Sequence, residues 1–359
     1  MARSLLVLGA GMSGLSAAVA GREAGFDVTV LEARDRIGGR ILSQPLAGGG
    51  GHADLGPAWM WPAYQTRLET LRRALGVDAA PQYETGAFSY EEGGQVQRFA
   101  APCRYGDAIR FPGGASGLVE GLAAQLPAGT IRTGEIAATV RSGKGVEIET
   151  VGGASHTADQ AIIALPPRLA DLLVWEPGLS PDLSRALQGL PTWMGAHAKL
   201  IAVYERPFWR EQGLSGGGAS REGPVMEIAD QSPADGSLGV LFAFIGWPAE
   251  QRTREGEGLT GKVLDQFTRL FGEAARSPLE THLLDWSQER FTATEADRRY
   301  RGGHPHYGGA VFEQTWFDGR IAFAGAETIS ESGGLIEGAL LSGQRALQQL
   351  AEQPVRASA

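Results

Sequence analysis

A strand, a glycine-rich turn and a helix open this chain, and the next strand ends on a carboxylate. The apolar run SLLVL at residues 4–8 leads directly into GAGMSG at 9–14, and Glu32 closes the apolar segment 28–31. A strand followed by G-x-G-x-x-G, a helix and an acid about 20 residues further on is typical of a unit that binds a dinucleotide. The sequence therefore predicts an α/β fold with a Rossmann-like domain.

Each residue of this unit has a distinct task. Gly9 permits the tight turn, Gly11 lets a pyrophosphate approach the backbone, and Gly14 lets the helix pack closely on the strand. The free N–H groups and the dipole at the start of the helix favour phosphates. Glu32 can accept hydrogen bonds from the ribose hydroxyls of the adenosine half. A glycine turn without a ligand is the alternative, but here strand, helix and acid all stand in register.

Composition and charge exclude several classes of protein. The 359 residues suit two interleaved domains, and 43% hydrophobic with 20% charged residues is ordinary for a globular protein. A net charge of −9 indicates no surface for nucleic acid, and no run approaches the ~18 apolar residues of a transmembrane span. The single cysteine, Cys103, excludes an internal disulfide, so we expect a reducing compartment, by default the cytoplasm. No metal-ligand cluster is apparent, and no metal is expected.

The order of the expected elements divides the chain between two domains. We assign residues 1–78, 112–167 and 286–359 to a discontinuous dinucleotide-binding domain, and residues 79–111 and 168–285 to a mixed α+β substrate domain. In the substrate domain, two long strands are expected at 195–205 and 238–247, with a helix at 258–272. The glycine-rich stretch 212–224 is expected to be a mobile loop.

Two further glycine-rich segments look suited to meet the first one. The loop ARDRIGGR at residues 33–40 offers its backbone and the side chain of Arg40 to a pyrophosphate. Near the end of the chain, the apolar strand 320–324 runs into GAET at 325–328, and a helix is expected from about 334 to 352.

Four of these segments resemble the flavin-containing amine oxidases, a family that includes monoamine, polyamine and L-amino-acid oxidases. They are the loop 36–40, the apolar strand that ends in Leu165-Pro-Pro, the strand of Lys199, and the last glycine-rich segment with its GLIEGA sequence. The resemblance is dense at 4–60 and 315–350, clear at 160–168 and 195–210, and weak between. It implies a glutathione-reductase-type FAD-binding domain interleaved with the substrate domain.

The resemblance implies non-covalent FAD, because no cysteine stands where some relatives attach their flavin. It places the adenine at the backbone of Ile136 and the ribityl hydroxyls at Glu327. The helix that begins near Gly334 would aim its N-terminus at the N1–C2 edge of the ring, where it stabilises negative charge. The cofactor-binding residues that it implies are Gly9, Gly11, Gly14, Glu32, Arg34, Gly39, Arg40, Gly56, Pro57, Ala58, Trp59, Ile136, Gly325, Glu327, Gly334 and Leu335.

Lys199 stands out because only three of the 32 basic residues are lysines. It alternates with His197 and Ile201 on one face of an expected strand, where burial lowers the pKa of an ammonium. In the amine oxidases a lysine stands ten residues before the tryptophan of a Pro-Phe-Trp sequence, as Lys199 does before Trp209. By resemblance it reaches flavin N5 through a water molecule and assists reoxidation by oxygen. A strand lysine that extends to solvent is the alternative.

The reaction that the resemblance implies is oxidation of a small or aromatic amine. The flavin takes a hydride equivalent from the α-carbon, the resulting imine hydrolyses to a carbonyl compound, and oxygen is reduced to H2O2. With few acidic residues facing the pocket, a monoamine is expected rather than a polyamine. The partners are thus a small-molecule amine and O2, in a monomer or a homodimer. The expected pocket residues are Trp61, His197, Phe244, His304, Tyr307 and Leu335.

The pattern departs from the family in the aromatic cage that usually flanks the substrate nitrogen. Leu335 and Pro305 occupy the two cage positions, and Tyr307 is the candidate substitute. Two alternatives therefore stay open: an FAD-dependent desaturase or dehydrogenase acting on a non-amine substrate, as carotene desaturases and protoporphyrinogen oxidase do, and a flavin-binding module without turnover. The chain is also short for the family, which predicts the loss of a helical insertion over the pocket and a more open entrance.

Overall fold

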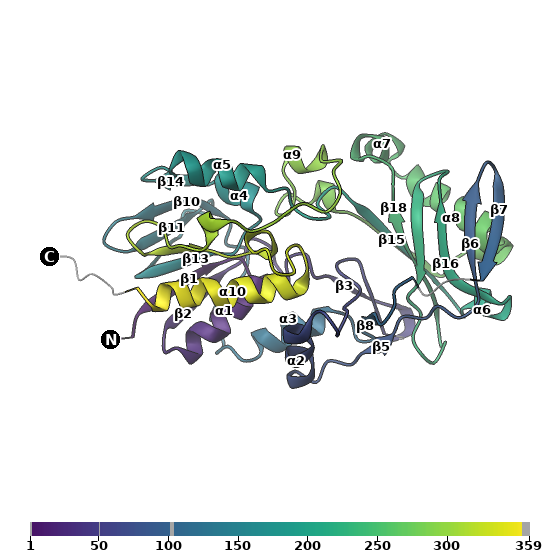
Figure 1. Cartoon of the computed structure of the whole chain (residues 1–359), viewed down its shortest axis with the longest axis horizontal. Helices are drawn as coiled ribbons and strands as arrows, with labels where there is room; N and C mark the ends of the chain where they lie inside the picture. Colours follow the sequence, from purple (N-terminus) through teal and green to yellow (C-terminus); the bar gives the residue numbers. More distant parts are fainter. Residues whose placement is uncertain (1, 50, 101–103, 354–359) are drawn as a thin grey trace.

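The chain forms two lobes (Figure 1). The structure is a computed structural model, and it describes residues 2–49, 51–100 and 104–353. The first strand and the last helix lie in the same lobe, at the left of Figure 1. The sheet of the other lobe is built from segments within residues 87–100 and 198–285. Both ends of the chain thus contribute to one lobe, as the prediction of a discontinuous domain requires.

A five-stranded parallel sheet forms the centre of the first lobe. Its strands, in spatial order, are β20 (Ile321–Phe323), β13 (Gln160–Ile163), β1 (Ser4–Leu8), β2 (Asp27–Leu31) and β9 (Ile131–Arg132). Both faces of this sheet are covered, since Leu5 and Val7 enter one hydrophobic core and Leu6 and Leu8 enter another. The sheet confirms the predicted α/β fold.

Two helices bring the first and last glycine-rich segments together. α1 (Met12–Glu23) and α10 (Ile336–Ala351) pack against each other in the same core. A Cβ at Gly343 of α10 would overlap the carbonyl of Ser13, so only a glycine allows this close approach. The helix that follows the first glycine turn therefore lies beside the helix that follows the last one.

A second sheet in this lobe changes the expected domain boundary. Its strands, in spatial order, are β12 (Ser155–Ala158), β11 (Val146–Thr150), β10 (Ala137–Ser142) and β14 (Val174–Glu176). The core behind it also contains residues of α4 (Pro167–Asp171) and α5 (Pro181–Gly189). Residues 168–189, assigned above to the substrate domain, thus pack with the nucleotide-binding lobe.

The second lobe is built on a seven-stranded sheet, whose strands in spatial order are β19 (Glu280–Asp285), β15 (Ala198–Tyr204), β18 (Gly239–Ile245), β17 (Val225–Asp230), β16 (Leu214–Ser220), β6 (Ala87–Glu92) and β7 (Gln95–Ala100). Helix α8 (Gly258–Phe271) packs on one face, in a core with alternate residues of β15 and β18. The opposite face carries Ile201 and Phe242, which pack with Leu55 from the first part of the chain.

Strand β16 corrects the expectation of a mobile loop at 212–224. The glycines of this stretch serve close packing inside the sheet. A Cβ at Gly216 would lie 2.5 Å from the indole nitrogen of Trp209, and one at Gly218 would lie 3.2 Å from the carbonyl oxygen of Ser89. Sequence reasoning took the glycines for a turn signal, whereas the neighbouring elements require residues without side chains.

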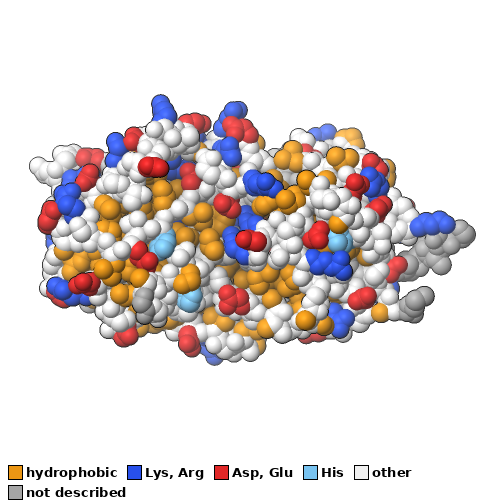
Figure 2. Space-filling model, turned by 180° about the vertical axis from the view of Figure 1, so that it is seen from behind, with side chains coloured by type: hydrophobic (Ala, Val, Ile, Leu, Met, Phe, Trp, Pro, Cys, Tyr) orange, Lys and Arg blue, Asp and Glu red, His pale blue; other side chains and the backbone are white. Residues whose placement is uncertain are grey.

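Shorter elements complete the fold: β3 (Ser43–Pro45), β4 (His52–Asp54), α2 (Thr66–Ala74), β5 (Ala80–Pro81), β8 (Ile109–Arg110), α3 (Ser116–Ala123), α6 (Phe208–Glu211), α7 (Ala249–Glu255) and α9 (Glu295–Arg298). Within the described residues, no helix combines the length and apolar character that crossing a membrane requires. On the face seen in Figure 2, acidic and basic side chains are interspersed, and the described part of that face shows no continuous basic area.

Candidate cofactor and active site

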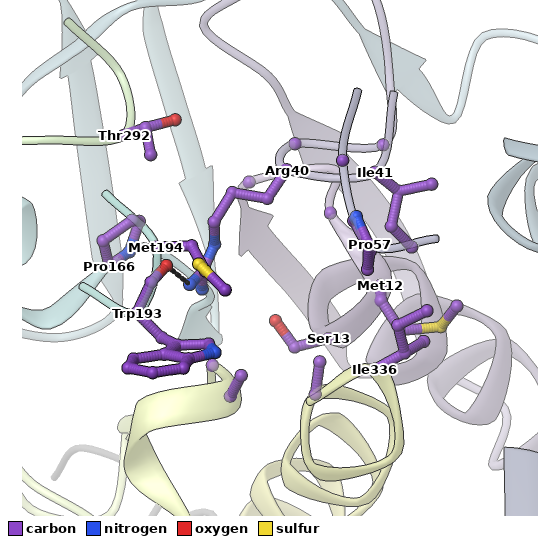
Figure 3. Close-up of a pocket in the computed structure, with 18 of the residues that line it drawn as sticks. Met12, Ser13, Arg40, Ile41, Pro57, Pro166, Trp193, Met194, Thr292 and Ile336 are labelled. Atoms are coloured by element: carbon purple, nitrogen blue, oxygen red, sulfur yellow. Dashed lines mark hydrogen bonds between the residues drawn. The ribbon is translucent and has the colours of Figure 1, made fainter. Parts of the chain in front are cut away.

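A cavity with a volume of about 560 Å³ lies between elements of the two lobes, and both glycine-rich segments line it. Gly11 contributes from the first turn, Gly325 from the last segment, and Lys199 from the seven-stranded sheet. Figure 3 shows part of this cavity, with Arg40 and Trp193 on one side and Met12, Ser13 and Ile336 on the other. The convergence that the sequence predicted is therefore present in the fold.

Most of the predicted site residues lie in the wall of this cavity. They are Gly9, Gly11, Glu32, Arg34, Gly39, Arg40, Gly56, Pro57, Ala58, Trp59, Trp61, Ile136, Lys199, Phe244, His304, Gly325, Gly334 and Leu335. Four predicted residues, Gly14, His197, Tyr307 and Glu327, do not line it. Cys103 lies outside the described residues.

The first glycine turn has the geometry that its three glycines predict. Gly9 has φ +107°, and a Cβ there would lie 2.6 Å from the carbonyl oxygen of Ala164. A Cβ at Gly14 would overlap the carbonyl of Gly9, so its absence lets helix α1 pack on β1. At Gly11 a Cβ would make only ordinary van der Waals contacts, the nearest with the carbonyl oxygen of Gly38 at 3.9 Å, and this backbone lines the cavity.

Helix α1 begins without a side-chain cap, at Gly11, and its first residues Met12 and Ser13 line the cavity. The first N–H groups of a helix have no partner within the helix, so they are available to an anion. Together with the position of Gly11 in the cavity wall, this uncapped start fits a pyrophosphate.

Glu32 is held rigidly at the same end of the cavity. It is 4% exposed, and its carboxylate accepts hydrogen bonds from the backbone N–H groups of Ala10 (2.8 Å) and Arg34 (3.0 Å). The Arg34 side chain is fixed in turn by Thr292 at 2.8 Å and Glu289 at 3.3 Å. An oriented carboxylate in the cavity wall fits the ribose-binding role predicted for Glu32.

Glu327 lies behind the wall and orients Arg40. It is fully buried, and its two carboxylate oxygens accept hydrogen bonds from the Arg40 guanidinium at 2.5 and 2.9 Å. Burial alone would lower the pKa of Arg40, but the contact with Glu327 outweighs it and raises that pKa. In this structure Glu327 supports Arg40, which borders the cavity next to Trp193 (Figure 3), and the direct contact of Glu327 with the ribityl chain stays a prediction.

The start of α10 also meets the cavity without a side-chain cap. Gly334, Leu335 and Ile336 line it, with Leu335 as the N-cap residue. Gly334 has φ +79°, and a Cβ there would lie 2.9 Å from the Tyr307 ring. A free helix N-terminus at this place fits the predicted contact with the flavin edge.

Tyr307 does not replace the missing aromatic ring, contrary to expectation. It packs behind the Gly334 turn, and its hydroxyl donates a hydrogen bond to the carbonyl of Pro191 at 2.9 Å. Trp193 takes an aromatic position in the wall instead, with its ring 4.6 Å from the ring of His304. Its neighbour Met194 has φ +60°, an uncommon conformation for a residue with a side chain, and also lines the cavity.

Lys199 is almost wholly buried, 4% exposed, yet its side chain lines the cavity. Its ammonium donates a hydrogen bond to the carbonyl of Gly56 and lies 5.1 Å from the ring centre of Phe244. Burial lowers the pKa of Lys199 to about 7, and the charge of Asp54 opposes this effect. A group with this pKa can gain or lose a proton near neutral pH, which suits a catalytic role.

His197, predicted as a pocket residue, packs behind the wall. Its ring centre lies 6.3 Å from that of Trp193 and 6.5 Å from that of Phe244. Burial, and then the charge of Lys199, lowers the pKa of His197 to about 4, so the ring is neutral at physiological pH. It therefore adds no second positive charge beside Lys199.

The cavity wall also contains residues that the sequence did not predict, among them Trp193, Met194, Tyr105 and Glu227. Tyr105 and Glu227 meet through a hydrogen bond of 2.7 Å between the hydroxyl and the carboxylate. They stand 122 residues apart, and strand β17, which carries Glu227, had no expected counterpart. No local pattern in the sequence could have identified this pair.

Comparison with known proteins identifies the family and the fold that the chain shares. The sequence matches the family model of flavin-containing amine oxidoreductases over residues 12–104 and 102–351. A protein of Mycobacterium tuberculosis named putative flavin-containing monoamine oxidase AofH is 26% identical, over 97% of this chain and 96% of the relative. Among solved structures, cyclohexylamine oxidase from Brevibacterium oxydans superposes with a TM-score of 0.83 at 22% identity, covering 98% of this chain and 99% of the other. A redesigned putrescine oxidase gives a TM-score of 0.80 at 23% identity, covering 98% and 99%.

The alignment with the M. tuberculosis relative also reflects a difference in length. It extends over 452 positions and includes 97% of the 359 residues, so about 100 of its positions have no counterpart residue in this chain. This agrees with the expectation that the chain is short for its relatives.

Proposed function

Because the chain belongs to the family of flavin-containing amine oxidoreductases, we propose that it oxidises a small amine to an imine and transfers the electrons to oxygen as H2O2. The observation that carries this proposal is the position of Lys199. A buried lysine with a pKa of about 7 lines the same cavity as both glycine-rich segments. A cofactor held by those segments would extend toward this side chain.

The residues of the cavity fit FAD along its length. The uncapped start of α1 and the Gly11 backbone in the cavity wall would hold the pyrophosphate, and Glu32 would hold the ribose. The start of α10 at Leu335 would face the flavin ring. When bound, FAD supplies the redox chemistry by accepting a hydride equivalent from the substrate.

We propose that the flavin is bound without a covalent link. No cysteine is among the described residues of the cavity wall, and Cys103 is outside the described residues. His304 lines the wall, and a covalent link through its ring is the alternative. Acid precipitation of the holoprotein should leave all flavin in the supernatant, whereas flavin in the pellet would identify a covalent bond.

The protein itself contributes two features to the proposed reaction: apolar rings that exclude water, and one ionisable side chain, Lys199. The apolar rings of the cavity wall, among them Trp193, exclude water from the space beside Lys199, and a desolvated amine there is favoured in its neutral form. The Lys199 ammonium, fixed by the carbonyl of Gly56, can hold a water molecule or a proton at Nζ near neutral pH. These are the two tasks that amine oxidation with oxygen requires of the protein.

A second candidate function is desaturation of a non-amine substrate by the same fold. Leu335 in the wall favours it, since the aliphatic residue replaces one ring of the amine cage and Tyr307 does not restore it. Lys199 favours the oxidase, because a desaturase that uses another electron acceptor has no need of an ammonium for reaction with oxygen.

The test is a panel of amines added to purified protein that contains FAD. An oxidase bleaches its flavin absorbance with an amine in the absence of oxygen and forms H2O2 when oxygen is admitted. A flavoprotein that no amine bleaches would contradict the proposal and leave the desaturase. A protein that does not bind FAD would contradict the whole assignment.

A further inference from the structure

Three residues of the cavity wall form one row across the seven-stranded sheet. Lys199 of β15 is paired with Phe244 of β18, and Phe244 is paired with Glu227 of β17. Residues directly opposite each other in neighbouring antiparallel strands point to the same face of a sheet. All three side chains line the cavity, so an ammonium stands at one end of the row and a carboxylate at the other.

The row fixes the separation of these two charges. Neighbouring strands lie about 4.8 Å apart, so Lys199 and Glu227 stand about 10 Å apart along the sheet, with Phe244 between them. A substrate whose reacting carbon lies near Lys199 therefore extends along Phe244 toward the carboxylate.

One oxygen of the Glu227 carboxylate is available to accept a hydrogen bond from a ligand. Its Oε1 accepts a hydrogen bond from the Tyr105 hydroxyl at 2.7 Å and lies 3.4 Å from an Arg104 nitrogen. In the described part of the chain, both contacts use Oε1, and Oε2 forms no hydrogen bond. The side chain of Glu227 is 27% exposed, so Oε2 can accept a donor from the cavity.

Aromatic rings line the path toward this carboxylate. Trp59 is stacked on Tyr105, with ring centres 5.0 Å apart and planes at 16°, and its ring centre lies 6.2 Å from that of Phe244. The Trp59 indole is held in place by a hydrogen bond of 2.7 Å to Gln82. Ring faces that border a carboxylate favour a cation over an anion or a neutral group.

We propose that Glu227 binds a second positive charge of the substrate, so that the preferred substrates are diamines with an ammonium at the end remote from the reacting carbon. This inference rests on the proposed amine oxidation and specifies its substrate class. Since a carbon–carbon bond is about 1.5 Å long, a spacer of about four to six carbons fits the space between the reacting end and Glu227. In the absence of substrate, Arg104 and Tyr105 stabilise the carboxylate.

The inference revises the expectation of a monoamine. That expectation came from the lack of an identifiable acid facing the pocket. The acid is present, on a strand whose pairing partner, Phe244, was among the predicted pocket residues.

The test compares two chain-matched amines on the holoprotein. The kcat/KM for 1,5-diaminopentane should exceed that for pentylamine by roughly 10- to 100-fold, the range expected of a hydrogen bond to a charged group. Glu227→Gln should remove this preference, mainly by raising the KM for 1,5-diaminopentane, so that the two amines react with similar kcat/KM. Glu120→Gln, which removes a charge from an exposed position on α3, should behave as the wild type.

A second readout needs no turnover. A diamine without hydrogen on either carbon beside nitrogen, 2,5-dimethylhexane-2,5-diamine, cannot form an imine. This diamine should raise the melting temperature of the wild-type holoprotein more than a monoamine of the same carbon skeleton does. Glu227→Gln should abolish this difference in melting temperature. This measurement detects the second charge even where catalysis fails.

The outcomes separate the two proposals. Equal kcat/KM for pentylamine and diaminopentane, with no effect of Glu227→Gln, would overturn the inference and leave the amine oxidase in place. Bleaching by neither amine, nor by any other of the panel, would overturn the proposed function instead. A Glu227→Gln variant with reduced flavin content or melting temperature would be replaced by Glu227→Asp, which should retain the preference for the diamine but shift it to a longer spacer.

Discussion

One wall of the cavity, formed by the two glycine-rich segments, offers backbone groups to a ligand, and another wall, formed by the seven-stranded sheet, offers charged side chains. They are called the first wall and the sheet wall below. On the first wall, Gly11 borders the cavity and the uncapped helix starts at Met12 and Ile336 present N–H groups. On the sheet wall, Lys199 of β15 and Glu227 of β17 present charges from two strands that flank β18. Backbone N–H groups do not titrate, whereas Lys199 has a pKa of about 7. Pyrophosphate binding by these N–H groups should therefore be insensitive to pH, while the reaction should depend on pH through Lys199.

The largest effect is expected from Lys199→Met, which removes the charge and keeps the length of the side chain. Reoxidation of the reduced flavin by oxygen should slow by about 10²- to 10⁴-fold, the usual contribution of a positioned acid or base. Flavin content should stay unchanged, because the first wall is intact. Stopped-flow absorbance after mixing reduced enzyme with oxygen measures the rate. Lys144→Met, on the exposed hairpin between β10 and β11, is the matched control, and an equal rate in both variants would refute the role of Lys199.

The corresponding test of the first wall is Gly11→Val, which should weaken FAD binding. Its side chain would occupy the space reserved for the pyrophosphate, and FAD should bind roughly 10- to 100-fold more weakly, as overpacking typically costs 1–3 kcal/mol. Fluorescence titration of the flavin-free protein with FAD measures this affinity. Gly143→Val adds the same side chain where no atom lies within 4 Å. If both variants bound FAD equally well, the first wall would not hold the pyrophosphate.

Asp54→Asn tests whether the charge of Asp54 raises the pKa of Lys199. Asp54 is buried, accepts hydrogen bonds from Ser43 (2.5 Å) and the Ala115 N–H (3.0 Å), and raises the pKa of Lys199 by its charge. Without that charge, the pKa of Lys199 falls further below 7. The ammonium is present below its pKa and lost above it, so oxidase activity should decline at a pH about one unit lower than in the wild type.

The pH dependence of the reoxidation rate measures this shift. Asp235→Asn removes the same charge from an exposed loop of the second lobe and should leave the profile in place. A profile that moves to higher pH, or does not move in Asp54→Asn, would show that Lys199 does not govern the decline.

The smallest effect is expected from Tyr307→Phe. Because Tyr307 lies behind the wall, the change removes its hydrogen bond to the Pro191 carbonyl and leaves the cavity unaltered. The free energy of unfolding should fall by about 1 kcal/mol, and kcat/KM for the best amine should change less than twofold. Denaturant titration and steady-state kinetics provide the two numbers. A large loss of activity at unchanged stability would return Tyr307 to the substrate pocket.

The two walls also differ in how far the sequence predicts them. The first wall is local in sequence: Gly9, Gly11 and Glu32 belong to one βαβ unit, whose spacing alone indicates its ligand. Lys199 could be predicted because its distance from Trp209 is a family feature. The parts of the fold with long apolar strands or strong helical periodicity, such as β15 and α8, were predicted within a few residues.

What escaped prediction depends on contacts between distant residues. Glu227 reaches the cavity through strand register, which no segment of the sequence encodes by itself. Resemblance to the family assigned Glu327 to the ribityl chain, but resemblance could not show its partner Arg40, which stands 287 residues away. The glycines of β16 were misread for the same reason, since Trp209 and Ser89 require them.

The entrance of the cavity remains a prediction. The alignment positions without a counterpart in this chain agree with the loss of an insertion. If that insertion is the helical cover expected from resemblance, the flavin should be open to small solutes, and iodide should quench its fluorescence strongly.

The most direct test of the whole account is a crystal structure of the protein with FAD. We predict one FAD that extends from Glu32 past Gly11 to the start of α10, with its N5 atom a single water molecule away from the Lys199 ammonium. A flavin ring that points away from Lys199, or an FAD that contacts one of the two glycine-rich segments without the other, would contradict it.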